Sequence, residues 1–280
     1  MLLQTLSFLI FGQRVQVVCS DGLLASAVAA NYSALTAEFG EHRPDLHYIL
    51  AGTSRPGEFL LTCRDRAAVT VLGMGRLLFD LEKDLTIALQ QRRPDLLFLH
   101  AAALESSGNA YLLAGDSGHG KSTAAWGLLH HGFRYMSDEL SPIDLCSLRV
   151  LPYPRALHLK RLPPPAYPLP VGDILDFGAT LQVPVPALPA AAVCAPCALG
   201  AVIFVRYQAG PHPPVLRAIS PAEAGARMYV TVLNALAHPG HGLDAVVHLA
   251  ERVPCFSLRS ADLRVTCEVV SKAFATPGPK

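Results

Sequence analysis

One nine-residue run constrains this chain more than any other segment. It reads Gly115-Asp116-Ser117-Gly118-His119-Gly120-Lys121-Ser122-Thr123 and matches the pattern G-x-x-x-x-G-K-[ST] in full. The apolar stretch 110–114 precedes it, and a helical pattern over 123–130 follows it. The sequence therefore predicts a buried strand, a tight glycine loop and a helix in direct succession.

Each fixed position of this run has a physical reason. Glycines let the backbone turn tightly and bring its N–H groups close to an anion, and the following helix points its positive end at the same place. The Lys121 ammonium can reach β- and γ-phosphates, and the Ser122 hydroxyl can ligate Mg²⁺. Residues 115–123 are therefore predicted to bind a nucleoside triphosphate with Mg²⁺, with ATP expected and GTP left open.

The charge balance argues for a local anion site. Lys plus Arg total 23 and Asp plus Glu total 22 in 280 residues, which gives a formal net charge of +1. Such a balance gives no excess of positive charge with which to bind nucleic acid or an anionic membrane. Hydrophobic residues make up 51% of the chain, enough to bury a sizeable core.

Cysteine usage and the apolar runs bear on the compartment. The seven cysteines are odd in number and scattered, which favours free thiols in a reducing compartment. Residues 1–12 lack a basic start and a cleavage site, so we interpret them as a first strand. No run reaches the roughly 18 to 20 apolar residues of a membrane span. We expect a soluble, cytoplasmic protein, and the sequence leaves a homo-oligomer open.

Residues 1–95 are predicted to form a small α+β part. Two β-rich runs around residues 12–13 indicate a hairpin over 5–19, and Ser20-Asp21 then starts a helical stretch with an N-cap residue. The remaining elements expected here are short strands at 47–51, 58–63 and 67–71 and an amphipathic helix over 75–92.

Residues 96–280 are predicted to form the larger, α/β part, with a mixed sheet around the glycine loop. Eleven of the 23 prolines fall between 151 and 200, so this stretch is expected to be a long irregular loop. The other elements expected are strands at 96–99, 110–114, 199–205 and 254–258, a helix start with a capping box at 220–223, and helices at 242–252 and 260–273.

An adjacent acid pair, Asp138-Glu139, follows the loop at a chemically useful distance. It lies 138 − 121 = 17 residues past Lys121, which leaves room for one helix and one short strand. Two acids at the end of such a strand can divide two tasks. One accepts a proton from an attacking hydroxyl, and the other helps to hold Mg²⁺. The alternative is a solvated turn.

At this point the chain resembles a known family. The segments 100–104, 113–123, 131–134 and 137–139 are similar to the catalytic domain of HPr kinase/phosphorylase. They are more similar still to the HPr-kinase-related proteins found with peptide-modification systems. The resemblance is specific over about residues 98–160 and covers only the element order elsewhere. It implies the α/β fold that this family shares with the phosphate-binding core of phosphoenolpyruvate carboxykinase.

The resemblance also implies an activity: transfer of the ATP γ-phosphate to a serine of a protein or a ribosomally made precursor peptide. By the same resemblance His100 lies beside the nucleotide, Lys121 and Ser122 hold phosphate and Mg²⁺, Asp138 accepts the serine proton, and Glu139 holds the metal. Glu139 replaces the family's usual aspartate. The family's downstream glycine-containing signature is missing, which argues against the reverse reaction, phosphorolysis.

The segment 152–161 occupies the place of that signature and is basic. Alternation along a strand sets Arg155 and Lys160 on opposite faces, and either cation could stabilise the transferring phosphoryl group. A solvated basic face is the alternative. Two other functions stay open: a kinase of a small-molecule hydroxyl or carboxyl, and a nucleotide-binding accessory protein without phosphoryl transfer.

Overall fold

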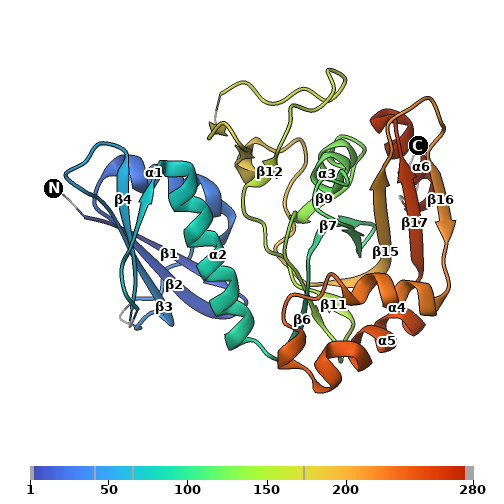
Figure 1. Cartoon of the computed structure of the whole chain (residues 1–280), viewed down its shortest axis with the longest axis horizontal. Helices are drawn as coiled ribbons and strands as arrows, with labels where there is room; N and C mark the ends of the chain where they lie inside the picture. Colours follow the sequence, from blue (N-terminus) through green and yellow to red (C-terminus); the bar gives the residue numbers. More distant parts are fainter. Residues whose placement is uncertain (1–2, 41, 65, 173, 275–280) are drawn as a thin grey trace.

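The computed structural model describes residues 3–40, 42–64, 66–172 and 174–274, and over these it shows a mixed α/β protein with three β-sheets (Figure 1). The first sheet has five strands in sequence order. They are β1 (Gln4–Ile10), β2 (Gln13–Cys19), β3 (Leu46–Gly52), β4 (Glu58–Cys63) and β5 (Val69–Leu72). Two helices, α1 (Gly22–Tyr32) and α2 (Met74–Arg92), and the 3-10 turn η1 (Ser33–Leu35) accompany this sheet.

Local sequence accounts for most of this first part. β1 and β2 form the predicted antiparallel hairpin. The Asp21 carboxylate accepts the amides of Leu23 and Leu24, both at 3.0 Å, and so caps α1. In α2 the predicted apolar stripe is buried, and its members are Leu77, Leu78, Leu81, Leu85 and Leu89. These contacts fix α2 against the sheet.

The second sheet begins after residue 95 and is mixed, as predicted. Its main order is β6-β10-β11-β15-β8-β7-β9, and β17 and β16 extend it from β15. β15 runs parallel to β8 and to β17, whereas the other pairs are antiparallel. The strands are β6 (Leu96–Leu99), β7 (Ala101–Ser106), β8 (Asn109–Ala114), β9 (Arg134–Ser137), β10 (Ser141–Asp144), β11 (Arg149–Val150), β15 (Cys197–Tyr207), β16 (Val215–Ala218) and β17 (Cys255–Ser260).

Helices cover both faces of this sheet. Alternate residues of β7, β8 and β15 join two separate apolar clusters, one with α3 (Lys121–Leu129) and α6 (Leu263–Phe274) and the other with α4 (Pro221–Tyr229) and α5 (Leu243–Arg252). The 3-10 turns η3 (Ala235–Ala237) and η4 (Pro239–Gly242) connect α4 to α5. The predicted capping box starts α4, where Ser220 Oγ accepts the amide of Glu223 at 3.2 Å.

The structure adds one strand and corrects one expectation. An unpredicted strand, β7, lies between β6 and β8 in the sequence and forms a hairpin with β8. The proline-rich stretch, expected to be irregular, is not wholly so. It contains a third sheet of β12 (Leu157–Leu159), β14 (Leu181–Val183) and β13 (Leu175–Asp176), followed by the turn η2 (Val185–Ala187). None of these elements exceeds three residues, which is the length that flanking prolines permit.

The two parts of the chain share one apolar core. The cluster that contains α1, α2 and the five-stranded sheet also includes Leu96, Phe98, Leu140 and Tyr153. The Phe11 ring lies 5.9 Å from that of Phe98 and 5.5 Å from that of Tyr153, measured between centroids. In Figure 1, α2 accordingly lies between the first sheet and the rest of the chain.

Surface features add little that is specific. In the described part of the chain no helix has the length and apolarity to cross a membrane. All seven cysteines are free.

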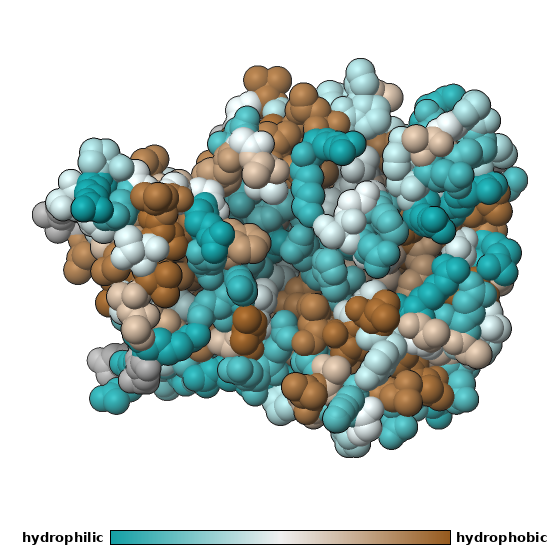
Figure 2. All heavy atoms as spheres, in the orientation of Figure 1, coloured by the Kyte–Doolittle hydropathy of each residue, from teal (hydrophilic) through white to brown (hydrophobic). Residues whose placement is uncertain are grey.

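Apolar surface gathers over α4 and α5 (Figure 2), where the exposed apolar side chains are Val230, Leu233, Leu236, Leu243 and Val247. Apolar atoms form more than half of an ordinary protein surface, so this patch carries no assignment by itself.

Candidate functional site

The glycine-rich loop (residues 115–123) connects β8 to α3 in a conformation that only glycine adopts easily. Gly115, Gly118 and Gly120 have φ values of +146°, +84° and +88°. A Cβ atom at Gly115 would lie 2.6 Å from the carbonyl oxygen of Val205 in β15, so the loop also packs too closely there for a side chain. Strand, loop and helix therefore follow one another as the sequence predicts.

This loop has the donors that a polyphosphate needs. Lys121, Ser122 and Thr123 form the first turn of α3, where amide groups have no acceptor within the helix. Lys121 is buried to 7% exposure, and its Nζ donates to the carbonyl oxygens of Gly115 at 2.7 Å and Asp116 at 3.2 Å. Burial lowers the pKa of Lys121, and the nearby Glu139 opposes that effect. The residues of the loop fit a bound triphosphate, which would give this ammonium charged acceptors.

The acid pair lies at the end of β9, as predicted, but its two members differ in exposure. β9 pairs with β7, which pairs with β8, the strand that leads into the loop. Ser137 pairs with Ala103, and Ala101 pairs with Ala114, the last residue before the loop, so the acid pair follows a strand at the sheet edge where the loop begins. Asp138 has 0% exposure, whereas the Glu139 side chain is 48% exposed. Glu139 is therefore the solvent-exposed member of the acid pair.

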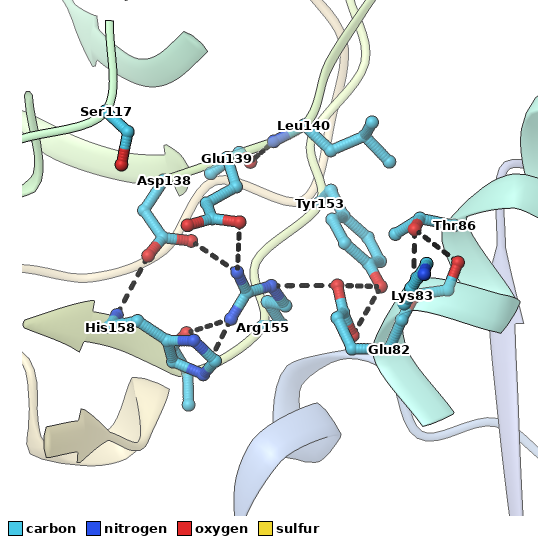
Figure 3. Close-up of polar contacts among 12 residues, drawn as sticks. Glu82, Lys83, Thr86, Ser117, Asp138, Glu139, Leu140, Tyr153, Arg155 and His158 are labelled. Atoms are coloured by element: carbon cyan, nitrogen blue, oxygen red, sulfur yellow. Dashed lines mark hydrogen bonds and ion pairs between the residues drawn. The ribbon is translucent and has the colours of Figure 1, made fainter. Parts of the chain in front are cut away.

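Asp138 is held from several sides within the protein (Figure 3). Its Oδ2 accepts the backbone amide of His158 at 2.8 Å, and its Oδ1 lies 3.3 Å from both Tyr135 Oη and Arg155 Nη2. Burial raises the pKa of Asp138 to about 6, and the Arg155 charge limits the rise. A carboxyl group with such a pKa exchanges a proton near neutral pH, which suits acid–base chemistry.

Arg155 is buried, and each nitrogen of its guanidinium contacts another group of the protein. Nε lies 3.0 Å from Glu82 Oε1, and Nη2 lies 3.3 Å from Asp138 Oδ1 and 3.7 Å from Glu139 Oε2. Nη1 donates to the Ala156 carbonyl at 3.1 Å and contacts His158 Nε2 at 2.7 Å. Of the two candidate cations, Arg155 and Lys160, Arg155 is therefore the one that contacts the acid pair.

Lys160 is the cation that reaches the loop. Its Nζ donates to Ser117 Oγ at 2.8 Å, just beyond the end of β12. His100 lies on the same side, between β6 and β7, with its amide bonded to the Thr231 carbonyl at 2.8 Å. Burial lowers the pKa of His100, as do Lys121 and Lys160, and so favours the neutral ring. The structure therefore gathers His100, Lys121, Glu139 and Lys160 around the loop.

The contacts around Asp138 and Arg155 involve residues that were not predicted from the sequence as site residues: Tyr135, His158, Glu82, Tyr32 and Tyr153. Tyr32 and Tyr153 both donate hydroxyl hydrogen bonds to Glu82, which contacts Arg155. One signal was available, because Glu82 lies four residues after Leu78 and three before Leu85, inside the apolar stripe of α2. An acid in that stripe needs a buried partner, but the sequence does not say which.

Metal binding would involve few protein ligands. Over the described ranges, no three or more His, Cys, Asp or Glu side chains are grouped so as to hold a metal ion. Mg²⁺ that enters with a nucleotide usually takes one or two protein ligands and fills its remaining positions with phosphate oxygens and water. The Ser122 hydroxyl and the exposed Glu139 carboxylate are of the right chemistry for that limited set.

Comparisons with known proteins give a weak structural likeness. No protein-family model and no curated protein matches the sequence. The solved structure of the HPr(Ser) kinase/phosphatase from Coxiella burnetii aligns with 63% of this chain and 94% of its own, at 12% sequence identity and a TM-score of 0.29. A score this low does not establish a common fold. The function must therefore be inferred from the residues of the site.

Proposed function

We propose that this protein is a phosphotransferase that binds MgATP at the glycine-rich loop and transfers the γ-phosphate to a hydroxyl group. The observation that carries the proposal is the position of the acid pair: it follows β9 at the sheet edge where the loop begins, and its first member, Asp138, is buried with its pKa raised to about 6. A protein that only binds nucleotide has no need of a titratable acid at this place.

Each residue then has a distinct task. Lys121 and the first-turn amides of α3 hold the phosphates, and Lys160 adds positive charge at Ser117. Ser122 and Glu139 would hold Mg²⁺, which neutralises the charge of the transferring group. Asp138 takes the proton of the acceptor hydroxyl as the acceptor oxygen bonds to the γ-phosphorus and the bond from that phosphorus to the β–γ bridging oxygen breaks. The products are ADP and the phosphorylated acceptor.

The burial of Asp138 places a condition on this role. Its carboxylate has no exposed surface, so an acceptor hydroxyl reaches it only when the contacts around it open. The contact with Arg155 Nη2 is 3.3 Å long, whereas the bond from the His158 amide is 2.8 Å. Catalytic hydrogen bonds often form only in the complex with substrate, and we expect the longer Arg155 contact to open first.

A serine of a protein or peptide is the acceptor that we favour. Beyond Lys160 the chain is open to solvent, with Leu162 at 75% and Val171 at 104% exposure. Two surface cavities of about 350 and 330 Å³ lie elsewhere, beside β5 and beside α5, and neither is lined by the loop or the acid pair. An exposed segment that begins just after Lys160, the residue that contacts the loop, suits an extended chain better than a small metabolite.

A second candidate has one observation in its favour. The complete burial of Asp138 and its engagement by Tyr135, Arg155 and His158 would also suit an accessory protein that binds nucleotide without phosphoryl transfer. In such a protein the acid pair would only hold the loop and β12 together.

The decisive experiment combines transfer with binding. The protein is incubated with MgATP and a library of serine peptides, products are read by mass spectrometry, and Lys121→Ala serves as the inactive control. We expect Asp138→Asn to reduce transfer by at least about 100-fold, since a general base contributes this much, while MgATP still binds. Normal transfer by Asp138→Asn would show that another group is the base. Tight MgATP binding by the wild type without any modified peptide would favour a small-molecule acceptor or the accessory role.

A further inference from the structure

A single buried guanidinium joins α2 to the acid pair. Arg155 is 1% exposed, and its planar group contacts Glu82 Oε1 through Nε at 3.0 Å and Asp138 Oδ1 through Nη2 at 3.3 Å (Figure 3). Glu82 belongs to α2, before residue 95, whereas Asp138 follows β9. Because the guanidinium is rigid, the place of Glu82 determines where Nη2 meets the acid pair.

Glu82 is itself fixed by buried donors. The hydroxyl of Tyr32 donates to Glu82, and that of Tyr153 lies 3.1 Å from Oε1 and 3.3 Å from Oε2. Tyr32 is 1% exposed and Tyr153 is 0% exposed. Burial raises the pKa of both tyrosines well above the ordinary value, so they remain donors throughout the neutral range. The carboxylate therefore has little freedom to turn away from Arg155.

Stability alone is a poor reason for this arrangement. Removing charges from water is costly, and apolar side chains of similar volume often fill such a space equally well. Here the buried charges converge on the one carboxylate that the proposed reaction uses as a base. Arg155 also places His158, whose Nε2 it contacts at 2.7 Å and whose amide donates to Asp138. The network holds Asp138 from two directions.

We propose that Glu82 is a positioning residue which, through Arg155, sets the geometry of Asp138 and Glu139, so that the first 95 residues form part of the catalytic apparatus. The inference rests on the proposed function for its kinetic consequence. The structural link from Glu82 to Asp138 stands independently of that function and can be measured without nucleotide.

The test compares two acids on one helix. Glu82→Gln removes the charge that contacts Arg155 and keeps the length of the side chain. Asp84→Asn is the matched control, because Asp84 also lies on α2 and accepts the hydroxyl of a buried tyrosine, Tyr48, at 2.7 Å, yet its charged partner is Arg66. Both variants lose one acid with a tyrosine partner, and only one of them touches the network of Arg155.

The first readout is the NMR signal of the His158 backbone amide in ¹⁵N-labelled protein, at one pH and without nucleotide. This amide donates to Asp138 Oδ2 at 2.8 Å, and Arg155 contacts both Asp138 and the His158 ring. Glu82→Gln is expected to shift the His158 amide signal, because Arg155 loses its charged partner on α2, while Asp84→Asn leaves the signal in place. An unchanged His158 amide signal in Glu82→Gln would overturn the inference.

The second readout is the rate of transfer. Glu82→Gln is expected to lower kcat by about tenfold with the KM for ATP within about twofold, as a displaced supporting residue does. Glu82→Asp keeps the charge but shortens the side chain, so it should also lower kcat and thereby separate position from charge. Wild-type rates in both variants would overturn the inference alone. A wild-type protein without MgATP binding or transfer would overturn the proposed function, while the His158 amide signal would still decide the link from Glu82 to Asp138.

Discussion

Lys160 Nζ donates a hydrogen bond to Ser117 Oγ at 2.8 Å and so connects the end of β12 to the glycine-rich loop. The charge on Lys160 also lowers the pKa of Lys121, whose ammonium lies over the same loop. The two ammonium groups repel each other, and an anion bound between them would offset that repulsion. The loop is thus electrostatically prepared for an anionic ligand.

Removing this second cation gives the first prediction. Lys160→Ala is expected to weaken MgATP binding by about tenfold, a loss of ~1.4 kcal/mol, because one charge-assisted contact to phosphate is lost. Stability without ligand should change by less than about 0.5 kcal/mol, since Lys160 is exposed. Isothermal titration calorimetry would measure the MgATP affinity of this variant and of Lys83→Ala, which replaces an exposed lysine on α2. Equal affinities for the two variants would remove Lys160 from the site.

The pH dependence of stability provides a second prediction. The folded pKa of Asp138 is about 6 and the ordinary value is 3.8, so the folded state binds this proton more tightly than the unfolded state. The resulting stabilisation is complete below about pH 4 and is lost as the pH rises through about 6. Urea unfolding should therefore show that the advantage of the wild type over Asp138→Asn shrinks across this range.

Asp45→Asn is the control for that series. The hydrogen bond from Arg14 lowers the pKa of Asp45, so its stabilisation is present above the ordinary value and is lost only as the pH falls further. The advantage of the wild type over Asp45→Asn should stay constant between about pH 4.5 and 6.5. If the advantage of the wild type over Asp138→Asn and over Asp45→Asn changed with pH in the same way, the raised pKa of Asp138 would be wrong.

The third prediction concerns two helical glycines whose replacement by alanine should change the stability of the protein in opposite directions. A Cβ atom at Gly127 in α3 would lie 2.6 Å from Cys267 Sγ in α6, so Gly127→Ala should destabilise the protein by about 1–3 kcal/mol through overpacking. At Gly225 in α4 the nearest atom, Ala250 Cβ, is 3.9 Å away, and Gly225→Ala should stabilise it by about 0.5–1 kcal/mol. Thermal and urea unfolding would compare them, and a stabilising Gly127→Ala would contradict the close contact of α3 with α6.

The loop glycines give a fourth prediction. Gly115→Ala and Gly118→Ala both place a side chain at positive φ, which costs about 1–2 kcal/mol. Only the Gly115 variant also meets the Val205 carbonyl, whereas a Cβ at Gly118 has open space around it. We expect Gly115→Ala to lose about 1–3 kcal/mol more stability than Gly118→Ala and to lose MgATP binding as well. Equal stabilities would mean that the loop shifts freely away from β15.

The elements that could be predicted from sequence are those with local signals. The hairpin of β1 and β2, the Asp21 cap, the stripe of α2 and the strand–loop–helix of residues 110–130 each follow from residues close in sequence. β7 was missed because its start, Ala101-Ala102-Ala103, has low strand propensity, and its burial comes only from pairing with β8 and β9.

In the candidate site, too, the residues with local sequence signals could be predicted and those that depend on long-range contacts could not. Lys121, Asp138 and Glu139 stand in short motifs with known spacing, so the sequence could name them. The orientation of Arg155 could not be predicted, because it depends on Glu82, a residue from another sheet's helix. Alternation along a strand also failed to apply, since Arg155 lies just before β12 rather than within it. Long-range ion pairing leaves no pattern in a single sequence.

The apolar cluster that unites Phe11, Leu140 and Tyr153 has a consequence for cooperativity. Leu140 follows the acid pair directly, and it is buried in the same cluster as the stripe of α2. Opening α2 would therefore expose the backbone around Asp138 in the same event. Amide hydrogens in α2 and β9 should exchange with solvent at one shared free energy, and the protein should unfold across residue 95 as a single cooperative unit.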